Sequence, residues 1–182
     1  DIMEINNTMS RYLREERFAL LPQTMIYVER TLHNGKLRRG LVGMVDLEQY
    51  DYEPGSPAQV RATEGTVLSR IPPRVAVRKN APIELPHVML LTDDPERTVI
   101  EPLAREKAGM EQVYDFDLME RGGHLAGWKL GREQLSAVAG ALQALADPAA
   151  FNARYGTQDQ PVLLFAVGDG NHSLATAKEC YE

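Results

Sequence analysis

The residues best suited to chemistry lie near the carboxyl end of this chain, in a glycine turn that carries an acid and leads to a histidine. The apolar run Val162–Val167 has the length and composition of a buried strand, Gly168-Asp169-Gly170 ends it, and a helical pattern follows. Such glycines let a ligand approach the backbone closely, and a helix start presents N–H donors and partial positive charge to a phosphate. The segment therefore indicates an anion site in which Asp169 and His172 add side-chain chemistry.

The same segment also allows a purely structural interpretation. Strand-to-helix turns with Asp-Gly are common, and most of them bind no ligand. Asn171 or Ser173 would then only cap the free N–H groups at the helix start. The turn by itself does not decide between the two interpretations.

A basic segment, Arg61–Lys79, stands out in an otherwise acidic chain. Its five basic residues and one acid, Glu64, give a net charge of +4, whereas the whole chain carries −6. A helix that begins after Pro72-Pro73 would place Arg74 and Arg78 one turn apart. The segment is either a solvated basic face or a phosphate clamp with Glu64 as an acid or base beside it.

Two other places carry residues that could do chemistry. The paired aspartates of Asp93-Asp94-Pro95 could hold Mg²⁺, although an Asp before Pro is more often a cap or a turn residue. His124 and Trp128 are four residues apart, so on a strand both side chains point to one face. That spacing alone favours a core tryptophan and an ordinary turn histidine.

The hydrophobic pattern predicts an α+β fold with a mixed or antiparallel sheet and flanking helices. At 182 residues, 43% of them apolar, the chain is long enough for one good core, and we expect a single domain over residues 1–182. The expected elements are a helix over 2–13, a hairpin of 23–28 and 37–47, a basic helical segment, a strand over 87–92, a helix over 99–107, a hairpin of 113–119 and 124–130, a helix over 135–146, a strand over 162–167 and a helix from about 171.

Composition excludes several classes of protein. The net charge of −6 argues against a general nucleic-acid binder, which would carry a basic excess. No apolar run reaches membrane-spanning length and no leader opens the chain, which predicts a cytoplasmic protein without a membrane partner. The single cysteine, Cys180, leaves no intrachain disulfide and no cysteine-based metal cluster. Because the chain opens on Asp1 and stops inside a continuing helical pattern, we expect a fragment of a longer protein.

Motifs along almost the whole chain resemble those of one family. In order, they are Gly40-Leu41-Val42-Gly43, Arg61-Ala62-Thr63-Glu64-Gly65-Thr66, Pro82-Ile83, Gly123-His124 with Trp128, and Gly168-Asp169-Gly170-Asn171-His172. The order is similar to that of the uncharacterised domain family related to archaeal free-serine kinases. That resemblance implies the ParB/sulfiredoxin-like fold.

The resemblance also implies an activity: phosphoryl transfer from ADP or ATP, with Mg²⁺, to a small hydroxyl-bearing metabolite such as serine. Glu64 would take the proton of the acceptor hydroxyl, Asp169 would hold Mg²⁺ or orient the acceptor, and His172 would join them in the catalytic group. His124 and Trp128 would line the acceptor pocket. The residues implied to bind the nucleotide phosphates are Arg61, Thr66, Arg70, Arg74, Gly168, Gly170, Asn171 and Ser173.

Two departures from the family's usual motifs favour an alternative hypothesis. Ser173 stands where the family usually has an arginine, and Thr63 stands where it usually has a histidine. A hydroxyl offers one donor to a phosphate, whereas a guanidinium can hold it with two. The alternative is a non-catalytic nucleotide-sensing or interaction module of the same fold.

Overall fold

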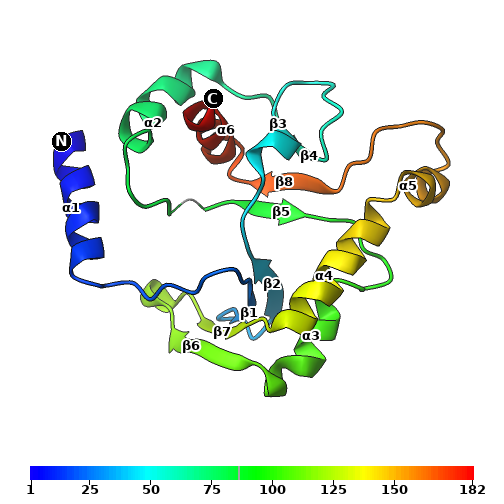
Figure 1. Cartoon of the computed structure of the whole chain (residues 1–182), viewed down its shortest axis with the longest axis horizontal. Coiled ribbons are helices and arrows are strands. Elements are labelled where there is room, and N and C mark those ends of the chain that lie inside the picture. The colour runs from blue at the N-terminus through cyan, green and yellow to red at the C-terminus, as the bar shows by residue number, and fades with distance from the viewer. Residues whose placement is uncertain (86) are drawn as a thin grey trace. The chain divides into compact units, whose positions relative to one another are not determined.

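The chain is α+β, as the sequence predicts. The computed structural model describes residues 1–85 and 87–182, and among these it contains two sheets and six α-helices (Figure 1). Two compact units make up the chain. The first unit comprises Asp1–Leu20, Val45–Asp93 and Phe151–Glu182, and the second comprises Leu21–Met44 and Asp94–Ala150.

The two units are built from alternating segments of the chain, so each unit combines elements that are far apart in the sequence. The first unit contains α1 (Ile2–Arg14), η1 (Leu47–Gln49), β3 (Tyr50–Asp51), β4 (Val60–Ala62), η2 (Leu68–Arg70), α2 (Ile71–Arg78), β5 (Met89–Leu91), β8 (Phe165–Asp169) and α6 (Asn171–Tyr181). The second unit contains β1 (Ile26–Thr31), β2 (Leu37–Val42), α3 (Glu101–Glu106), η3 (Lys107–Gly109), β6 (Glu111–Asp117), η4 (Met119–Arg121), β7 (His124–Lys129) and α4 (Arg132–Leu145). Helix α5 (Pro148–Tyr155) begins in the sequence of the second unit and ends in that of the first.

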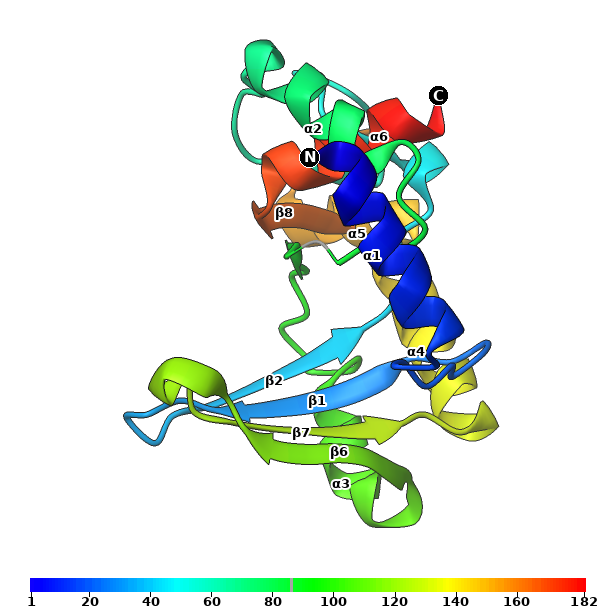
Figure 2. The same ribbon diagram turned by 90° about the vertical axis from the view of Figure 1, so that its left-hand side faces the viewer.

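The sheet of the second unit is antiparallel and confirms both predicted hairpins. Its strand order is β2-β1-β7-β6, and Figure 2 shows the four strands as one layer. Strand β1 pairs with β7 so that Tyr27 lies opposite Trp128. Paired residues of neighbouring strands share a face, so both aromatic rings lie on the same side of the sheet.

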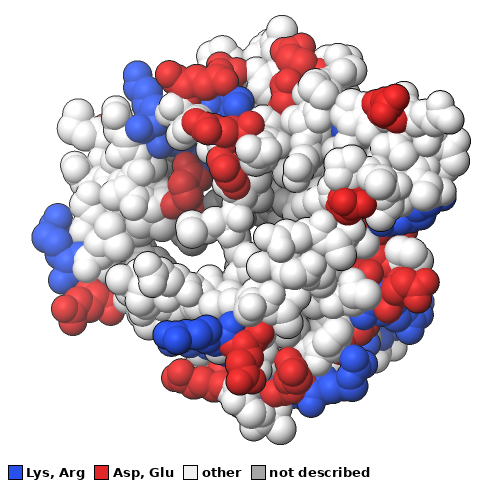
Figure 3. All heavy atoms as spheres, turned by 45° about the vertical axis from the view of Figure 1, so that its right-hand side comes forward, with Lys and Arg blue, Asp and Glu red and all other residues white. Residues whose placement is uncertain are grey.

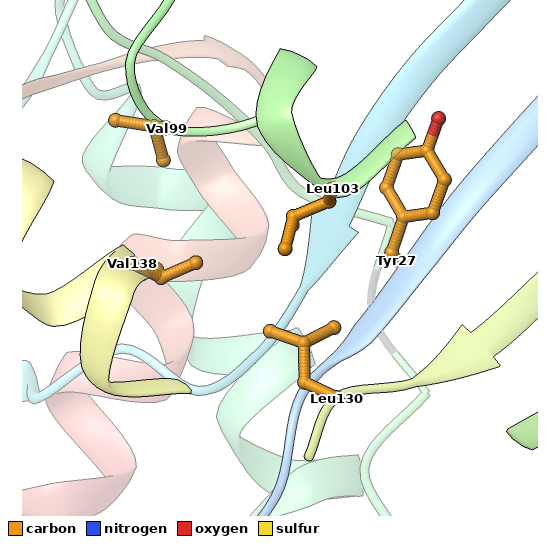
Figure 4. Close-up of a cluster of buried hydrophobic side chains, with 5 residues drawn as sticks. All are labelled: Tyr27, Val99, Leu103, Leu130 and Val138. Carbon is orange, nitrogen blue, oxygen red and sulfur yellow. The ribbon is translucent and has the colours of Figure 1, made fainter. Parts of the chain in front are cut away.

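Helices α3 and α4 bury that side of the sheet. The buried cluster consists of Tyr27, Val99, Leu103, Leu130 and Val138. Figure 4 shows that these side chains come from strand, loop and helix and point into one common space. This cluster is the hydrophobic core of the second unit, and burying it is the main source of that unit's stability.

A polar network crosses the same side of the sheet. The Tyr27 hydroxyl donates to Glu29 Oε2 at 2.6 Å, and Lys107 Nζ lies 2.8 Å from Glu29 Oε1. Burial raises the pKa of Tyr27, and its hydrogen bond to the Glu29 carboxylate raises it further. Burial alone would raise the pKa of Glu29, but the hydrogen bonds from Lys107 and Tyr27 outweigh it and lower that pKa. Glu29 therefore stays ionised and paired in the folded chain.

The sheet of the first unit is mixed. Its strand order is β3-β4-β8-β5, with β3, β4 and β8 mutually parallel and β5 antiparallel to β8. Tyr50, Val60, Val167 and Leu174 form its buried cluster, so α6 packs on this sheet through Leu174. Strands β3 and β4 are two and three residues long, too short for a hydrophobic period to reveal them in the sequence.

The strand before the glycine turn differs from its predicted bounds. It covers Phe165–Asp169 rather than Val162–Val167. The N–H groups of Leu164 and Phe165 both donate to Gln59 O, and regular pairing with β4 begins only at Phe165. At the other end, Met89 of β5 pairs with Asp169, which extends the strand through Gly168. Two of the three residues expected in the turn are therefore part of the sheet.

Hydrogen bonds of three residues near its carboxyl end hold helix α6 in place. Tyr52 donates a hydrogen bond to Glu179, and that bond raises the pKa of Tyr52 to about 12. The Tyr181 hydroxyl donates to Glu48 at 2.7 Å, and Lys178 Nζ donates to the Leu47 carbonyl at 2.8 Å. These bonds hold the carboxyl half of α6 to η1 and to Tyr52, the residue after β3. The position of the whole helix, including its first turn, is thereby fixed.

Candidate functional site

The candidate site lies where β4 and β8 end side by side and α6 begins (Figure 1). The two strands are parallel, so their carboxyl ends meet at one edge of the sheet, with Ala62 opposite Val167. In α/β sheets, ligands bind outside the carboxyl ends of parallel strands, and a helix start favours anions. The loop after β4 carries Glu64 to this edge, and β8 carries Asp169 to it.

Asn171 fastens the two strand ends together. Its Oδ1 accepts from the Thr63 backbone N–H at 3.1 Å, and its Nδ2 lies 3.3 Å from Thr63 Oγ1. The Thr63 hydroxyl in turn donates to Val167 O at 2.6 Å. Asn171 is buried, and the residue at the N-cap position is Gly170. The prediction that Asn171 or Ser173 caps the helix was wrong, because both side chains bind neighbouring segments instead.

His172 holds the other end of the Glu64 loop. The Val67 backbone N–H donates to His172 Nε2 at 3.1 Å, so this nitrogen carries a lone pair and the ring proton sits on Nδ1. Nδ1 lies 3.9 Å from Glu64 Oε1. The His172 side chain is only 15% exposed, whereas that of Glu64 is 60% exposed. The His172 imidazole therefore holds the loop in place through Val67, and the Glu64 carboxylate is the group that a ligand can reach.

Gly170 is the one residue of the turn whose backbone conformation requires glycine. Its φ is +88°, and an added Cβ would lie 2.4 Å from the His87 carbonyl oxygen. The Gly170 N–H donates to Asp169 Oδ1 at 2.8 Å, and His87 Nε2 lies 3.1 Å from Asp169 Oδ2. His87 was not among the predicted site residues. Its only sequence signal was its place at the start of an apolar run.

Arg78 is the basic side chain that reaches the first turn of α6. Its Nη1 donates to Ser173 O at 2.7 Å and to Ser173 Oγ at 3.3 Å. The opposite edge of the guanidinium binds Glu84, with Nη2 at 2.7 Å from Oε2. Sequence reasoning counted Arg78 in the basic segment but did not assign it to the site, because nothing local shows that α2 lies beside α6.

Arg61, one of the arginines of the predicted phosphate clamp, does not lie at the glycine turn. The Arg61 guanidinium binds three backbone carbonyls, those of Ala58, Pro161 and Val162, at 2.5–3.0 Å. Pro161 and Val162 precede β8, whereas the turn follows it, so this guanidinium lies at the opposite end of the strand.

The remaining two arginines of the predicted clamp are exposed on η2 and α2. Arg74 Nη1 donates to Arg70 O at 2.8 Å, and the Arg70 side chain has no hydrogen bond to a described residue. Thr66 lies in the loop held by His172. Its Oγ1 is buried and has no hydrogen-bond partner among the described residues.

The predicted acceptor-pocket residues belong to the second unit. The Trp128 ring lies 5.8 Å from that of Tyr27 and 5.1 Å from Lys107 Nζ, which agrees with a core tryptophan. His124 lies at the start of β7, where Nδ1 is 2.7 Å from Asp117 Oδ1 and Nε2 contacts Asp115. Hydrogen bonds to Asp117 and Asp115 raise the pKa of His124.

The paired aspartates after β5 bind nearby protein groups. Asp94 Oδ2 accepts from the N–H groups of Thr98 and Val99 at 2.7 and 2.9 Å, which makes it a turn residue, because the N-cap of α3 is Ile100 and has no side-chain cap bond. Asp93 Oδ2 accepts from the Tyr155 hydroxyl at 2.5 Å. Across residues 1–85 and 87–182, no group of three or more His, Cys, Asp or Glu side chains is arranged to hold a metal ion.

The described residues carry charged side chains of both signs. Acidic and basic side chains lie intermixed over the face drawn in Figure 3. In the part of the chain that the structure describes, no helix has both the length and the apolar character to cross a bilayer.

Comparison with known proteins and protein families identifies a family for this chain. No curated protein and no solved structure is similar enough to this chain to be matched. One family model, described as "Protein of unknown function (DUF1015)", matches residues 1–182. Since that match spans the whole of the sequence, the chain belongs to the DUF1015 family.

Proposed function

We propose that the first unit binds the phosphates of ADP or ATP at the amino end of α6 and transfers the terminal phosphoryl group to a small hydroxyl-bearing metabolite such as serine. The observation that carries this proposal is the convergence of a helix start, two parallel strand ends and two carboxylates, those of Glu64 and Asp169. The motif resemblance to archaeal free-serine kinases and their ParB/sulfiredoxin-like fold adds support.

Phosphoryl transfer requires the protein mainly to position groups and to stabilise charge. The first N–H groups of a helix lack intrahelical partners, so those of α6 would donate to phosphate oxygens. The acceptor oxygen forms its bond to phosphorus as the bond to the leaving phosphate oxygen breaks. The electron pair of the broken bond stays on the leaving group, and the acceptor's proton passes to the Glu64 carboxylate. Glu64 suits this role because it is exposed and because both ends of its loop are fastened.

A magnesium ion would neutralise charge on the phosphates, and Asp169 fits it as a protein ligand. Mg²⁺ is commonly bound by one or two carboxylates, with phosphate oxygens and water completing its coordination. The Asp169 side chain is largely exposed, and β8 fixes its backbone. Among the described residues, its partners are the Gly170 N–H and exposed His87.

A second candidate function is nucleotide sensing without turnover. It is favoured by the contacts of Arg61 and by the serine at position 173. Arg61 is bound to three backbone carbonyls, and Ser173 takes the place of a motif arginine. Kinases place cationic groups around the transferred phosphoryl group, where they stabilise the charge of the transition state. A site with fewer such groups would bind a nucleotide through the helix start and transfer phosphate slowly.

The first experiment measures nucleotide binding by thermal shift, with ADP, ATP and CTP, each with and without Mg²⁺. A ligand present at 100 times its dissociation constant stabilises the folded state by about 2.7 kcal/mol, which a melting curve resolves. Binding by ADP or ATP that strengthens with Mg²⁺ supports the proposal. If no nucleotide changes the melting temperature, both candidate functions are wrong.

The second experiment separates the two candidates through Glu64→Gln. This substitution keeps the shape of the side chain and removes the proton acceptor, so nucleotide binding should persist while turnover falls by roughly 10²–10⁴-fold. The assay is phosphoryl transfer from ADP or ATP to serine and related hydroxyl compounds. Glu96→Gln, in an exposed turn, is the matched control and should leave both quantities unchanged. Nucleotide binding with no transfer to any acceptor would favour the sensing module.

A further inference from the structure

We infer that Arg78 is the side chain that receives an anionic phosphate group at this site, and that Glu84 competes with that group for the same edge of the guanidinium. The inference rests on the proposed function, because it names a further ligand-binding residue of the same site. It predicts a gain of anion binding when Glu84 loses its charge.

The Arg78 guanidinium is held from two sides. On one side, Nη1 donates to Ser173 O and Oγ at 2.7 and 3.3 Å. On the other side, Nε lies 3.1 Å from both oxygens of Glu84, and Nη2 lies 2.7 Å from Oε2. The first set of bonds involves the first turn of α6, and the second involves a side chain that can leave.

A carboxylate bound in this way occupies the position that a phosphate would take. A planar guanidinium presents parallel N–H donors that match two oxygens of either a carboxylate or a phosphate. Glu84 therefore serves as an internal substitute for an external anion. Because Nη1 is fixed to Ser173, the guanidinium keeps its orientation when Glu84 departs, and the Nε–Nη2 edge is then free.

The side chains of Arg78 and Glu84 differ in their exposure to solvent. The Arg78 side chain is 17% exposed, whereas that of Glu84 is 47% exposed. A largely buried cation without its anion is unfavourable, so the site favours occupation by one anion or another. Glu84, in contrast, regains water when it leaves, and its departure costs little.

Glu84 lies outside regular secondary structure. Residues 79–85 and 87–88 belong to no helix or strand, and they join α2 to β5. Among the described residues of this segment, Glu84 pairs with Arg78 and His87 pairs with Asp169. Arg78 also contacts Ser173 in the first turn of α6, and Asp169 lies two residues before that helix begins, so an anion bound at the amino end of α6 would lie beside both pairs.

Two other arginines of the segment, Arg61 and Arg74, are bound in ways that do not suit this role. The donors of Arg61 are taken by backbone carbonyls, which no ligand can displace without unfolding the chain locally. Arg74 binds the carbonyl of Arg70, one turn before it on the exposed side of α2. Arg78 alone among these three combines a contact to α6 with a partner that can be exchanged.

The test measures binding of inorganic pyrophosphate by isothermal titration calorimetry to the chain and to three variants. Glu84→Gln removes the competing charge and should tighten binding roughly tenfold, since charge-assisted pairs are worth about that factor. Glu15→Gln is the control: it removes the same charge from an ion pair with Arg17 at 2.6 Å just after α1, and it should leave binding unchanged. Arg78→Lys keeps the charge but loses the two-donor edge, and it should weaken binding at least tenfold.

The possible results separate this inference from the proposed function. Equal affinity of Glu84→Gln and Glu15→Gln, or unchanged affinity of Arg78→Lys, would overturn the inference while the anion site at α6 stands. If neither the chain nor any variant binds pyrophosphate or nucleotide, the proposed function fails and this inference fails with it. The gain expected for Glu84→Gln cannot arise from misfolding, so the test does not depend on the stability of the Arg78 variant.

Discussion

At the scale of single residues, the side chains of the first two residues of α6 hold the loop that carries Glu64. Asn171 holds Thr63, and His172 holds the Val67 N–H. The three residues between these anchors include Glu64, whose carboxylate faces outward. A catalytic base needs such support, because a small displacement of the reacting group lowers the rate strongly.

Gly170→Ala should destabilise the chain by about 1–3 kcal/mol, because a residue with a side chain is strained at this positive φ. The new Cβ would also lie 2.4 Å from the His87 carbonyl, which is backbone and cannot turn aside. The measurement is the free energy of unfolding in urea. Gly140→Ala in α4 is the matched control, because no atom lies within 4 Å of its added Cβ. This control should gain roughly 0.5–1 kcal/mol from helix propensity. Equal effects of the two substitutions would contradict the strain argument.

At the scale of elements, interactions between charged side chains hold strands β6 and β7 of the second unit together. His124 at the start of β7 lies between Asp115 and Asp117 of β6. Both carboxylates and the imidazole share one face, because Asp117 pairs with His124 and Asp115 pairs with Ala126. The positive charge on the ring, not its shape, is what the two carboxylates bind.

The stability of the second unit should therefore depend on pH through His124. The two hydrogen bonds raise the pKa of His124 above its ordinary value of 6.5. A group with a raised folded-state pKa stabilises fully below its unfolded-state value, and the contribution is lost as pH rises through the folded-state value. His124→Asn should thus lower the free energy of unfolding clearly at about pH 5.5 and much less at about pH 9. His33→Asn, in the exposed turn between β1 and β2, is the control and should show no such trend. A loss that is the same at both pH values would show that the imidazolium charge is not the cause.

At the scale of the whole molecule, stability comes from two separate cores. Tyr27, Leu103 and their neighbours form the core of the second unit, and Tyr50, Val167 and their neighbours form that of the first. The candidate site lies entirely in the first unit. His124 and Trp128, which the family resemblance assigned to an acceptor pocket, lie in the second.

Leu103→Ala should lower the free energy of unfolding of the chain by about 2–5 kcal/mol, because Leu103 is fully buried and its truncation leaves a cavity. Leu13→Ala on α1 removes the same atoms from a side chain that is largely exposed, and it should change stability by no more than about 0.5 kcal/mol. Urea unfolding measures both, and amide hydrogen exchange shows which strands lose protection. Protection should fall first in β1, β6 and β7. A uniform loss over β4 and β8 as well would mean that the two cores unfold together.

The sequence by itself determined most of the elements and little of their assembly. Long periodic segments, such as the α1 and α4 helices and the β1–β2 and β6–β7 hairpins, formed close to where the pattern predicted them. Their signals are local, because the spacing of apolar residues sets which face is buried. The glycine turn was also visible in the sequence, since Gly170 takes a backbone conformation that few other residues tolerate.

Only the tertiary structure decided which side chains meet at the site. Strand β4 exists because β3 and β8 pair with it, and its three residues carry no signal of their own. Arg61 and Arg78 are alike in sequence, yet one binds carbonyls at the start of β8 and the other reaches the first turn of α6. The physical reason is that a side chain's partners depend on contacts between residues far apart in the chain. Local propensity fixes an element, but only packing brings Arg78 and Glu84 to the same helix start as Glu64 and Asp169.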